Sequence, residues 1–177
     1  ALRSHVFGAE TPHQPQLPES APAMPFSTLN ALSPLDGRYA ARLAALRPLL
    51  SEYGLMHRRV QVEVEWFIAL SDEGFAEFPA LTQSSKGLLR SLVVRFSEAD
   101  AQAIKDIEKE TNHDVKAVEY WLRHRISHVP ELKARCEFIH FACTSEDINN
   151  TSHALMLKAA REQVPVSYTH LTLPTKR

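Results

Sequence analysis

Three adjacent polar residues in the middle of the chain combine an amide, an imidazole and a carboxylate: Asn112, His113 and Asp114. Apolar residues recur at helical spacing directly after them, so Asp114 is predicted to be the N-cap of a helix. At a helix N-terminus, free backbone N–H groups and the helix dipole favour an anionic ligand. A histidine there can donate to the anion or shuttle a proton near neutral pH. The run therefore predicts an anion-binding site, with His113 as its candidate catalytic residue.

A second polar run precedes another helical pattern. Thr144 or Ser145 is predicted to cap this helix. Glu146 and Asp147 fall in its first turn, where acidic side chains complement the helix dipole. Two hydroxyls and several N–H groups are then expected to face outward together, which suits a carboxylate ligand.

A tight turn is predicted at residues 33–39, because an Asp-Gly pair follows a proline there. The turn presents Arg38, whose fork of N–H donors suits a phosphate or a carboxylate, next to the ring of Tyr39. Each run taken alone also has a structural explanation. A polar tripeptide before a helix is usually only a cap, and Arg38 alone is equally well explained as a surface charge.

Together, the three runs resemble the adenylosuccinate lyase family of the fumarase/aspartase superfamily. The similarity extends over about residues 24–164 and is carried by residues 33–39, 111–120 and 140–150. Argininosuccinate lyase and fumarase share the Thr-Ser helix start. The Asn-His-Asp run and the Asp-Gly-Arg-Tyr turn are not expected in those two enzymes.

The resemblance implies a C–N lyase that releases fumarate by β-elimination. Its substrates are adenylosuccinate, giving AMP, and the succinyl-carboxamide ribotide of purine biosynthesis. A base removes a proton, the carbanion is stabilised as an aci-carboxylate, and an acid protonates the leaving nitrogen. The resemblance further implies no metal or other cofactor, a purine nucleotide as the small-molecule partner, a homotetramer and a cytoplasmic location.

The substrate-binding residues implied by the resemblance come from all three runs: Arg38, Tyr39, Asn112, His113, Asp114, Thr144 and Ser145. The arginine and tyrosine match positions that bind the nucleotide phosphate, and the Thr-Ser pair matches positions that hold the succinyl part. His113 is expected to assist catalysis by polarising or orienting the substrate. The family's general acid and general base match no residue of this chain, so the chain alone is expected to be inactive.

The composition argues against several other classes of protein. The 20 Lys and Arg residues nearly balance the 21 Asp and Glu residues, and no basic stripe indicates a nucleic-acid partner. No apolar run is long enough to span a membrane. Two cysteines are too few for a disulfide scaffold and are typical of a reducing cytoplasm. Two alternatives remain open: another lyase of the superfamily, such as argininosuccinate lyase or a cycloisomerase, and a non-enzymatic helical interaction module.

Four segments are expected along the chain. Residues 1–23 are proline-rich, lack apolar periodicity and are expected to be a disordered, non-native leader. Residues 24–142 are expected to form an N-terminal helical domain, and residues 143–164 the start of a central bundle of long helices. Residues 165–177 begin with a helix-interrupting proline and are expected to be an artefactual tail.

The predicted fold class is all-α. Helical spacing predicts helices over residues 40–50, 52–70, 84–96, 97–110, 114–127, 131–141 and 145–164. Residues 60–66 alternate like a strand, but no turn residues bound them, and helical spacing continues across their flanks. Four aromatic side chains are predicted to pack in the core or between helices: Trp66, Phe67, Tyr120 and Trp121.

Two groups of possible metal ligands have simpler explanations. Cys136, His140 and Cys143 would share one face of the predicted helix over residues 131–141 and its extension, but no fourth ligand with zinc-like spacing follows. A packed helix face is the favoured interpretation. His124 and His128 are four residues apart among arginines, which favours a solvated basic face.

Overall fold

The structure is a computed structural model that describes residues 29 and 31–163. The chain divides into two units, Ala1–Ala40 and Ala41–Arg177, and each is described by itself. Residues 1–23 and 165–177, for which the sequence predicts a leader and a tail, lie outside the described part of the chain.

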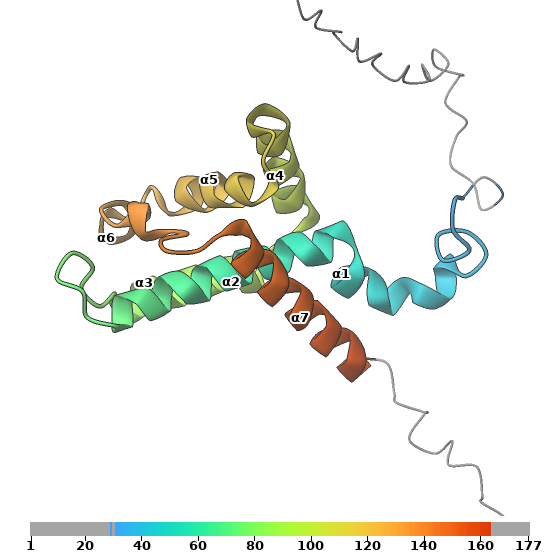
Figure 1. The fold of residues 1–177 in the computed structure, drawn as a ribbon, viewed down its shortest axis with the longest axis horizontal. Helices are drawn as coiled ribbons and strands as arrows, with labels where there is room; N and C mark the ends of the chain where they lie inside the picture. Colours follow the sequence, from blue (N-terminus) through green and yellow to red (C-terminus); the bar gives the residue numbers. More distant parts are fainter. Residues whose placement is uncertain (1–28, 30, 164–177) are drawn as a thin grey trace, which may run out of the picture. The chain divides into compact units, whose positions relative to one another are not determined.

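The described residues form an all-α fold, as predicted (Figure 1). The helices, in chain order, are the 3₁₀ helix η1 (Ala40–Leu46), α1 (Arg47–Leu50), α2 (Glu52–Asp72), α3 (Gln83–Val94), α4 (Glu98–Thr111), α5 (Asp114–Ile126), α6 (Pro130–Lys133), the 3₁₀ helix η2 (Cys136–Phe138) and α7 (Ser145–Gln163). An isolated antiparallel bridge joins Phe75 and Phe78. None of the helices in the described part is long and apolar enough to cross a membrane.

The predicted helix over residues 131–141 is wrong. The chain forms α6, then the short η2, and then turns twice through the left-handed region, at His140 (φ 63°) and Ala142 (φ 59°). A residue in the left-handed conformation cannot continue a right-handed helix. The two cysteines and His140 therefore do not share a helical face, and their spacing in the sequence has no structural meaning.

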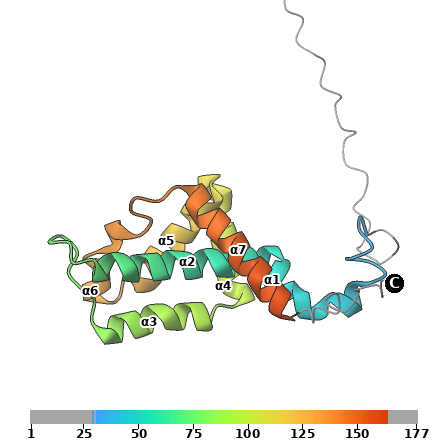
Figure 2. The same ribbon diagram turned by 60° about the horizontal axis from the view of Figure 1, so that its bottom comes forward.

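Helix α2 lies at the centre of the second unit and packs against α1, α3, α4, α5 and α7. The Ser51 hydroxyl caps it by accepting a hydrogen bond from the Gly54 backbone N–H, at 3.3 Å. In both views α3 runs alongside α2, whereas α7 crosses α2 steeply (Figure 2). The segment of α2 with strand-like alternation is helical, and Val60 and Val64 lie one turn apart on the helix face that is buried in the core.

Helices α4 and α5 pack against each other and against α2. A capping box starts α4: the Ser97 hydroxyl accepts from the Asp100 N–H, and the Asp100 carboxylate accepts from the Ser97 N–H at 3.0 Å. The Ser97-Glu98-Ala99-Asp100 run of the sequence is typical of this motif. The α4–α5 connection consists of only Asn112 and His113, so it positions the polar run of interest between two helix ends.

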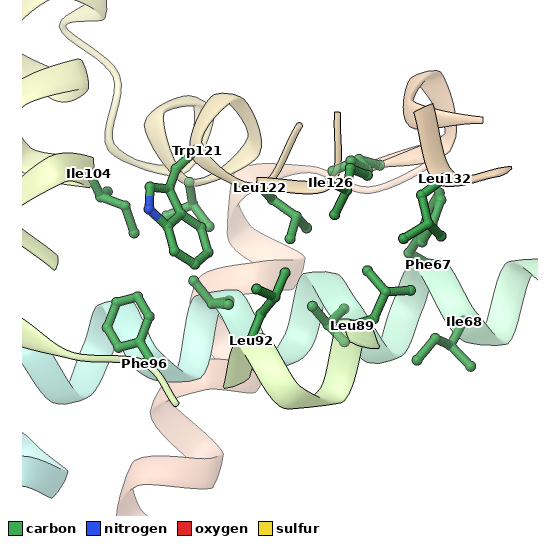
Figure 3. Packing of buried hydrophobic residues seen from close by; sticks show 14 of the residues in the cluster. Phe67, Ile68, Leu89, Leu92, Phe96, Ile104, Trp121, Leu122, Ile126 and Leu132 are labelled. Atoms are coloured by element: carbon green, nitrogen blue, oxygen red, sulfur yellow. The ribbon is translucent and has the colours of Figure 1, made fainter. Parts of the chain in front are cut away.

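The core lies between α2, α3 and α5 and is closed at one end by α6 (Figure 3). Phe67 and Leu122 are fully buried in it, and Trp121 meets the ring of Phe96 edge-on. The core placement predicted for Phe67 and Trp121 is confirmed. The prediction for Tyr120 is wrong, because its side chain is 44% exposed and packs under the Lys116 ammonium group.

Candidate active site

His113 is the N-cap of α5, and the prediction that Asp114 holds this position is wrong. His113 has an extended backbone, and its imidazole Nδ1 accepts a hydrogen bond from the Lys116 N–H, at 3.2 Å. Asp114 is the first residue of the helix. Histidine can take the capping role because a ring nitrogen with a free lone pair accepts as a hydroxyl oxygen would.

The carboxylate of Asp114 stabilises the same helix end in another way. One oxygen accepts from the Val115 N–H, at 2.8 Å, and the other accepts from the guanidinium of Arg59. Burial alone raises the pKa of Asp114, but the Val115 hydrogen bond and the Arg59 charge outweigh it and hold the pKa below its usual value. Asp114 is therefore a carboxylate at neutral pH.

Asn112 adopts the left-handed conformation (φ 51°) and ends α4. Its backbone N–H donates to the Glu108 carbonyl, at 2.8 Å. Asparagine tolerates this conformation better than most residues. Asn112 thus has a structural function in the turn between α4 and α5, and its exposed side chain remains available to a ligand.

Thr144 caps α7, one of the two positions that the sequence predicts. Its hydroxyl accepts from the Asp147 N–H at 3.4 Å and donates to the Asp147 carboxylate at 2.8 Å. The same carboxylate accepts from the Thr144 N–H at 2.7 Å, and these two hydrogen bonds lower the pKa of Asp147. Ser145, the first residue of α7, is half-buried. The N-cap Thr144 and Asp147 of the first turn are thus joined by three hydrogen bonds.

The starts of α5 and α7 meet at Arg59, a residue of α2 that is 7% exposed. The guanidinium Nη2 of Arg59 donates to the Asp114 carboxylate, and Nε donates to the Asn149 side-chain oxygen, at 2.8 Å. The structure therefore brings the polar run at residues 112–114 close to the first turn of α7.

The segment that leads into α7 is held by two further side chains of α2. The fully buried Glu63 accepts at Oε1 from His140 Nδ1, at 2.6 Å. Trp66 donates from Nε1 to the Phe141 carbonyl, at 2.8 Å. Burial raises the pKa of Glu63, although the hydrogen bond from His140 opposes this effect. Three residues of one α2 face thus fix the path of the chain into α7.

The turn at residues 33–39 belongs to the other unit and forms as predicted. The backbone N–H of Gly37 donates to the Ser33 carbonyl at 3.0 Å, and that of Tyr39 donates to the Pro34 carbonyl at 2.9 Å. Arg38 is exposed, and its guanidinium carbon lies 5.6 Å from the centroid of the Tyr39 ring. The predicted arrangement of a guanidinium beside an aromatic ring is therefore present.

A hollow of about 620 Å³ lies between α2 and α7. Its walls are largely apolar and include Trp66, Ile148 and Leu155, with Cys143 and Asp147 at the start of α7. None of the residues that the sequence predicts to bind substrate lines this hollow. The predicted residues of the second unit instead lie on or near its open surface.

Neither group of possible metal ligands forms a site. No cluster of three or more His, Cys, Asp or Glu side chains within residues 29 and 31–163 is arranged to hold a metal ion. His124 and His128 are exposed and lie near Arg95 and Arg125 around a shallow hollow. His124 and Arg125 lie in the last turn of α5, where positive charge complements the negative end of the helix dipole.

Sequence reasoning missed the role of Arg59, although a signal was present. Arg59 stands at helical spacing with Leu55, Val62 and Trp66, which places a charge among apolar positions of α2. A charge at such a position needs a partner, because an unpaired buried charge is strongly destabilising. The identity of the partners could not be read from the sequence, since they lie far away in the chain.

Comparison with known proteins places the chain in a family. A family model described as a lyase matches residues 37–172. Adenylosuccinate lyase of Escherichia coli (strain K12) is 56% identical over 146 residues, which make up 82% of this chain and 32% of that protein. Adenylosuccinate lyase of Vibrio cholerae is 54% identical over 142 residues, 80% of this chain and 31% of that protein. That of Buchnera aphidicola subsp. Acyrthosiphon pisum is 42% identical over the same shares.

The chain spans about a third of the length of the curated relatives that it matches. The resemblance to adenylosuccinate lyase found in the three polar runs is confirmed by these relatives, and the all-α fold agrees with it. Because the lyase family model covers most of the chain, this chain belongs to the lyase family.

Proposed function

We propose that this chain is the N-terminal part of an adenylosuccinate lyase, which releases fumarate from adenylosuccinate and from the succinyl-carboxamide ribotide of purine biosynthesis. The observation that carries the proposal is the junction at Arg59. It joins the start of α5, which bears His113, to the start of α7, which bears Thr144 and Ser145. The identity to adenylosuccinate lyases over 82% of the chain supports the same function.

His113 supplies a positioned N–H donor in this proposal. Because Nδ1 accepts from the Lys116 backbone N–H, Nε2 is the ring nitrogen that can donate to a substrate. The side chain of His113 is 52% exposed. Its Nε2–H can polarise a carboxylate or amide oxygen of the substrate or orient it for the elimination.

The other predicted residues bind the remainder of the substrate. Arg38 and Tyr39 receive the nucleotide phosphate, because a guanidinium fork makes two parallel hydrogen bonds to phosphate oxygens. Thr144 and Ser145 hold the succinyl part. Asn112 and Asp114 bind the substrate on either side of His113. No metal or other cofactor takes part in this proposal.

The proposal extends to the assembly of the whole protein. Residues 24–142 form the N-terminal domain, and residues 143–164 begin the central helical bundle of a cytoplasmic homotetramer. Leu157, on the second half of α7, is 67% exposed and is available to pack against another helix of such a bundle. The 177-residue chain alone is inactive in this proposal, because it spans only a third of the relatives' length.

A chimera tests the proposed function directly. This chain replaces the matching part of the E. coli adenylosuccinate lyase, and fumarate release is measured with both purine substrates and with argininosuccinate. Release from the purine substrates only is expected, from a protein that behaves as a tetramer in light scattering. A folded chimera that releases no fumarate from either purine substrate contradicts the proposal. Release from argininosuccinate instead supports the alternative lyase.

A further inference from the structure

Arg59 makes two hydrogen bonds that end on two different helices. Nε donates to Asn149, the fifth residue of α7, and Nη2 donates to Asp114, the first residue of α5. The Arg59 side chain is 8% exposed, so both bonds start from a buried guanidinium, although Asp114 is itself 43% exposed. Neither partner belongs to α2, the helix that carries Arg59. The guanidinium is therefore a bridge between two elements that are distant in the sequence.

The geometry of the guanidinium makes this bridge rigid. Its nitrogens lie in one plane at fixed angles, so the two acceptors must keep a fixed separation and direction. Lysine carries a single nitrogen on a flexible stem and cannot stand at the positions of both Nε and Nη2. Replacement of Arg59 by Lys is thus expected to release at least one of the two helix starts.

Arg59 is also the first member of a row on one face of α2. Arg59, Glu63 and Trp66 are spaced four and three residues apart, and all three bond the segment between His140 and Asn149. Glu63 and Trp66 bond only this segment, whereas Arg59 also reaches α5. Of these three residues, Arg59 is therefore the one that connects the start of α5 to the start of α7.

We infer that Arg59 is a positioning residue. It fixes the position of the start of α5, which bears His113, relative to the start of α7, which bears Thr144 and Ser145. This inference rests on the proposed function, in which those residues bind one substrate. Arg59 itself is buried and acts through its hydrogen bonds to Asp114 and Asn149. Its loss is expected to disturb substrate binding and turnover in molecules that remain folded.

The first test needs no catalytic activity. In the 177-residue chain, Arg59→Lys is expected to shift the NMR signals of the Val115 backbone amide and the Asn149 side-chain amide together. The matched control is Arg58→Lys, because Arg58 is the neighbouring residue and bonds only Gln61 on the same helix, at 2.6 Å. Signals at both helix starts that do not respond to Arg59→Lys overturn the inference.

The second test measures kinetics in the chimera described above. Arg59→Lys is expected to raise KM and to lower kcat/KM on the order of 10²-fold, the scale of a small misplacement of binding groups. Arg58→Lys is expected to leave both constants unchanged. A residue that only stabilises the fold lowers the unfolding temperature but leaves KM and kcat per folded molecule unchanged. That pattern for Arg59→Lys overturns the inference.

The two tests separate the inference from the proposed function. An unsubstituted chimera that is folded but inactive contradicts the function, and the NMR test then decides on Arg59 alone. If Arg59→Lys prevents folding, Asn149→Ala takes its place, because it removes one end of the bridge and leaves the guanidinium paired with Asp114. Asn149→Ala is expected to shift the Val115 signal on the distant helix and to raise KM. No change in either overturns the inference.

Discussion

The imidazole Nδ1 of His113 lies 3.2 Å from the backbone nitrogen of Lys116 and accepts its hydrogen bond. One side chain therefore caps α5 and also presents an exposed Nε2–H donor. Capping and chemistry are usually competing explanations of a polar residue before a helix, but here they are compatible. The cap holds the ring orientation and the tautomer that a substrate-polarising histidine needs.

Substitutions of His113 separate the two roles in the 177-residue chain. Asparagine is a good N-cap, so His113→Asn is expected to keep the stability of the chain within a few tenths of a kcal/mol. Alanine cannot accept the Lys116 hydrogen bond, so His113→Ala is expected to cost about 1 kcal/mol. Urea unfolding measures both values. Equal stability of the two variants would show that the cap contributes nothing.

Arg38→Lys is expected to weaken substrate binding in the chimera, because lysine lacks the fork that matches a phosphate. The expected result is a higher KM and a lower kcat/KM with an unchanged far-UV spectrum. Arg42→Lys is the matched control, since Arg42 is an exposed arginine of η1 just after the turn. Equal kinetic constants for both variants count against the phosphate role of Arg38.

Two glycine substitutions are predicted to act in opposite directions. A Cβ atom on Gly54 would lie 2.6 Å from the carbonyl carbon and oxygen of Leu49, so Gly54→Ala is expected to destabilise the chain by about 1–3 kcal/mol. Gly87, within α3, has open space around it, so Gly87→Ala is expected to stabilise the chain by about 0.5–1 kcal/mol. Thermal unfolding measures both. A loss of stability at Gly87 or a gain at Gly54 contradicts the packing described.

Glu63 is predicted to make the stability of the chain depend on pH. Burial raises its pKa in the folded state, so the folded chain holds the proton to higher pH than the unfolded chain does. The free energy of unfolding therefore falls as pH rises above the usual value of 4.5, until the folded-state pKa is passed. The titratable groups that act on this carboxyl are His140 and Glu119.

Glu63→Gln tests this dependence, because glutamine has nearly the same shape and does not titrate. In urea unfolding, the free energy of unfolding of the unsubstituted chain is expected to fall relative to that of Glu63→Gln as the pH rises from about 5 to 7. The control is Glu137→Gln, since Glu137 is exposed and its pKa is lowered by Arg123. A constant difference in the free energy of unfolding between Glu63→Gln and the unsubstituted chain across this pH range would contradict the assignment.

Local chemistry made much of the fold predictable from the sequence. The Ser97–Asp100 capping box and the Asp-Gly turn formed where their residues predict them, because both depend on neighbours in the chain. Helical spacing across α2 correctly outweighed its strand-like alternation. Long segments with consistent apolar periodicity bury one face, and this decides their structure.

The errors arose where distant contacts override local pattern. The segment after Pro130 keeps helical spacing, but Glu63 and Trp66 of α2 bond His140 and Phe141 and hold a turn instead. No local signal shows these contacts. The choice of His113 over Asp114 as N-cap has the same origin, because Arg59 engages the Asp114 carboxylate from another helix.

The turnover of the His113→Asn chimera tests the central claim most directly. This variant keeps the helix cap and removes the imidazole, so circular dichroism and the tetramer are expected to be unchanged. The rate kcat for fumarate release from adenylosuccinate is expected to fall by about 10²-fold or more, the scale of a positioned acid–base group. Near-normal kcat per folded molecule would contradict the account and would show that His113 serves only to cap α5.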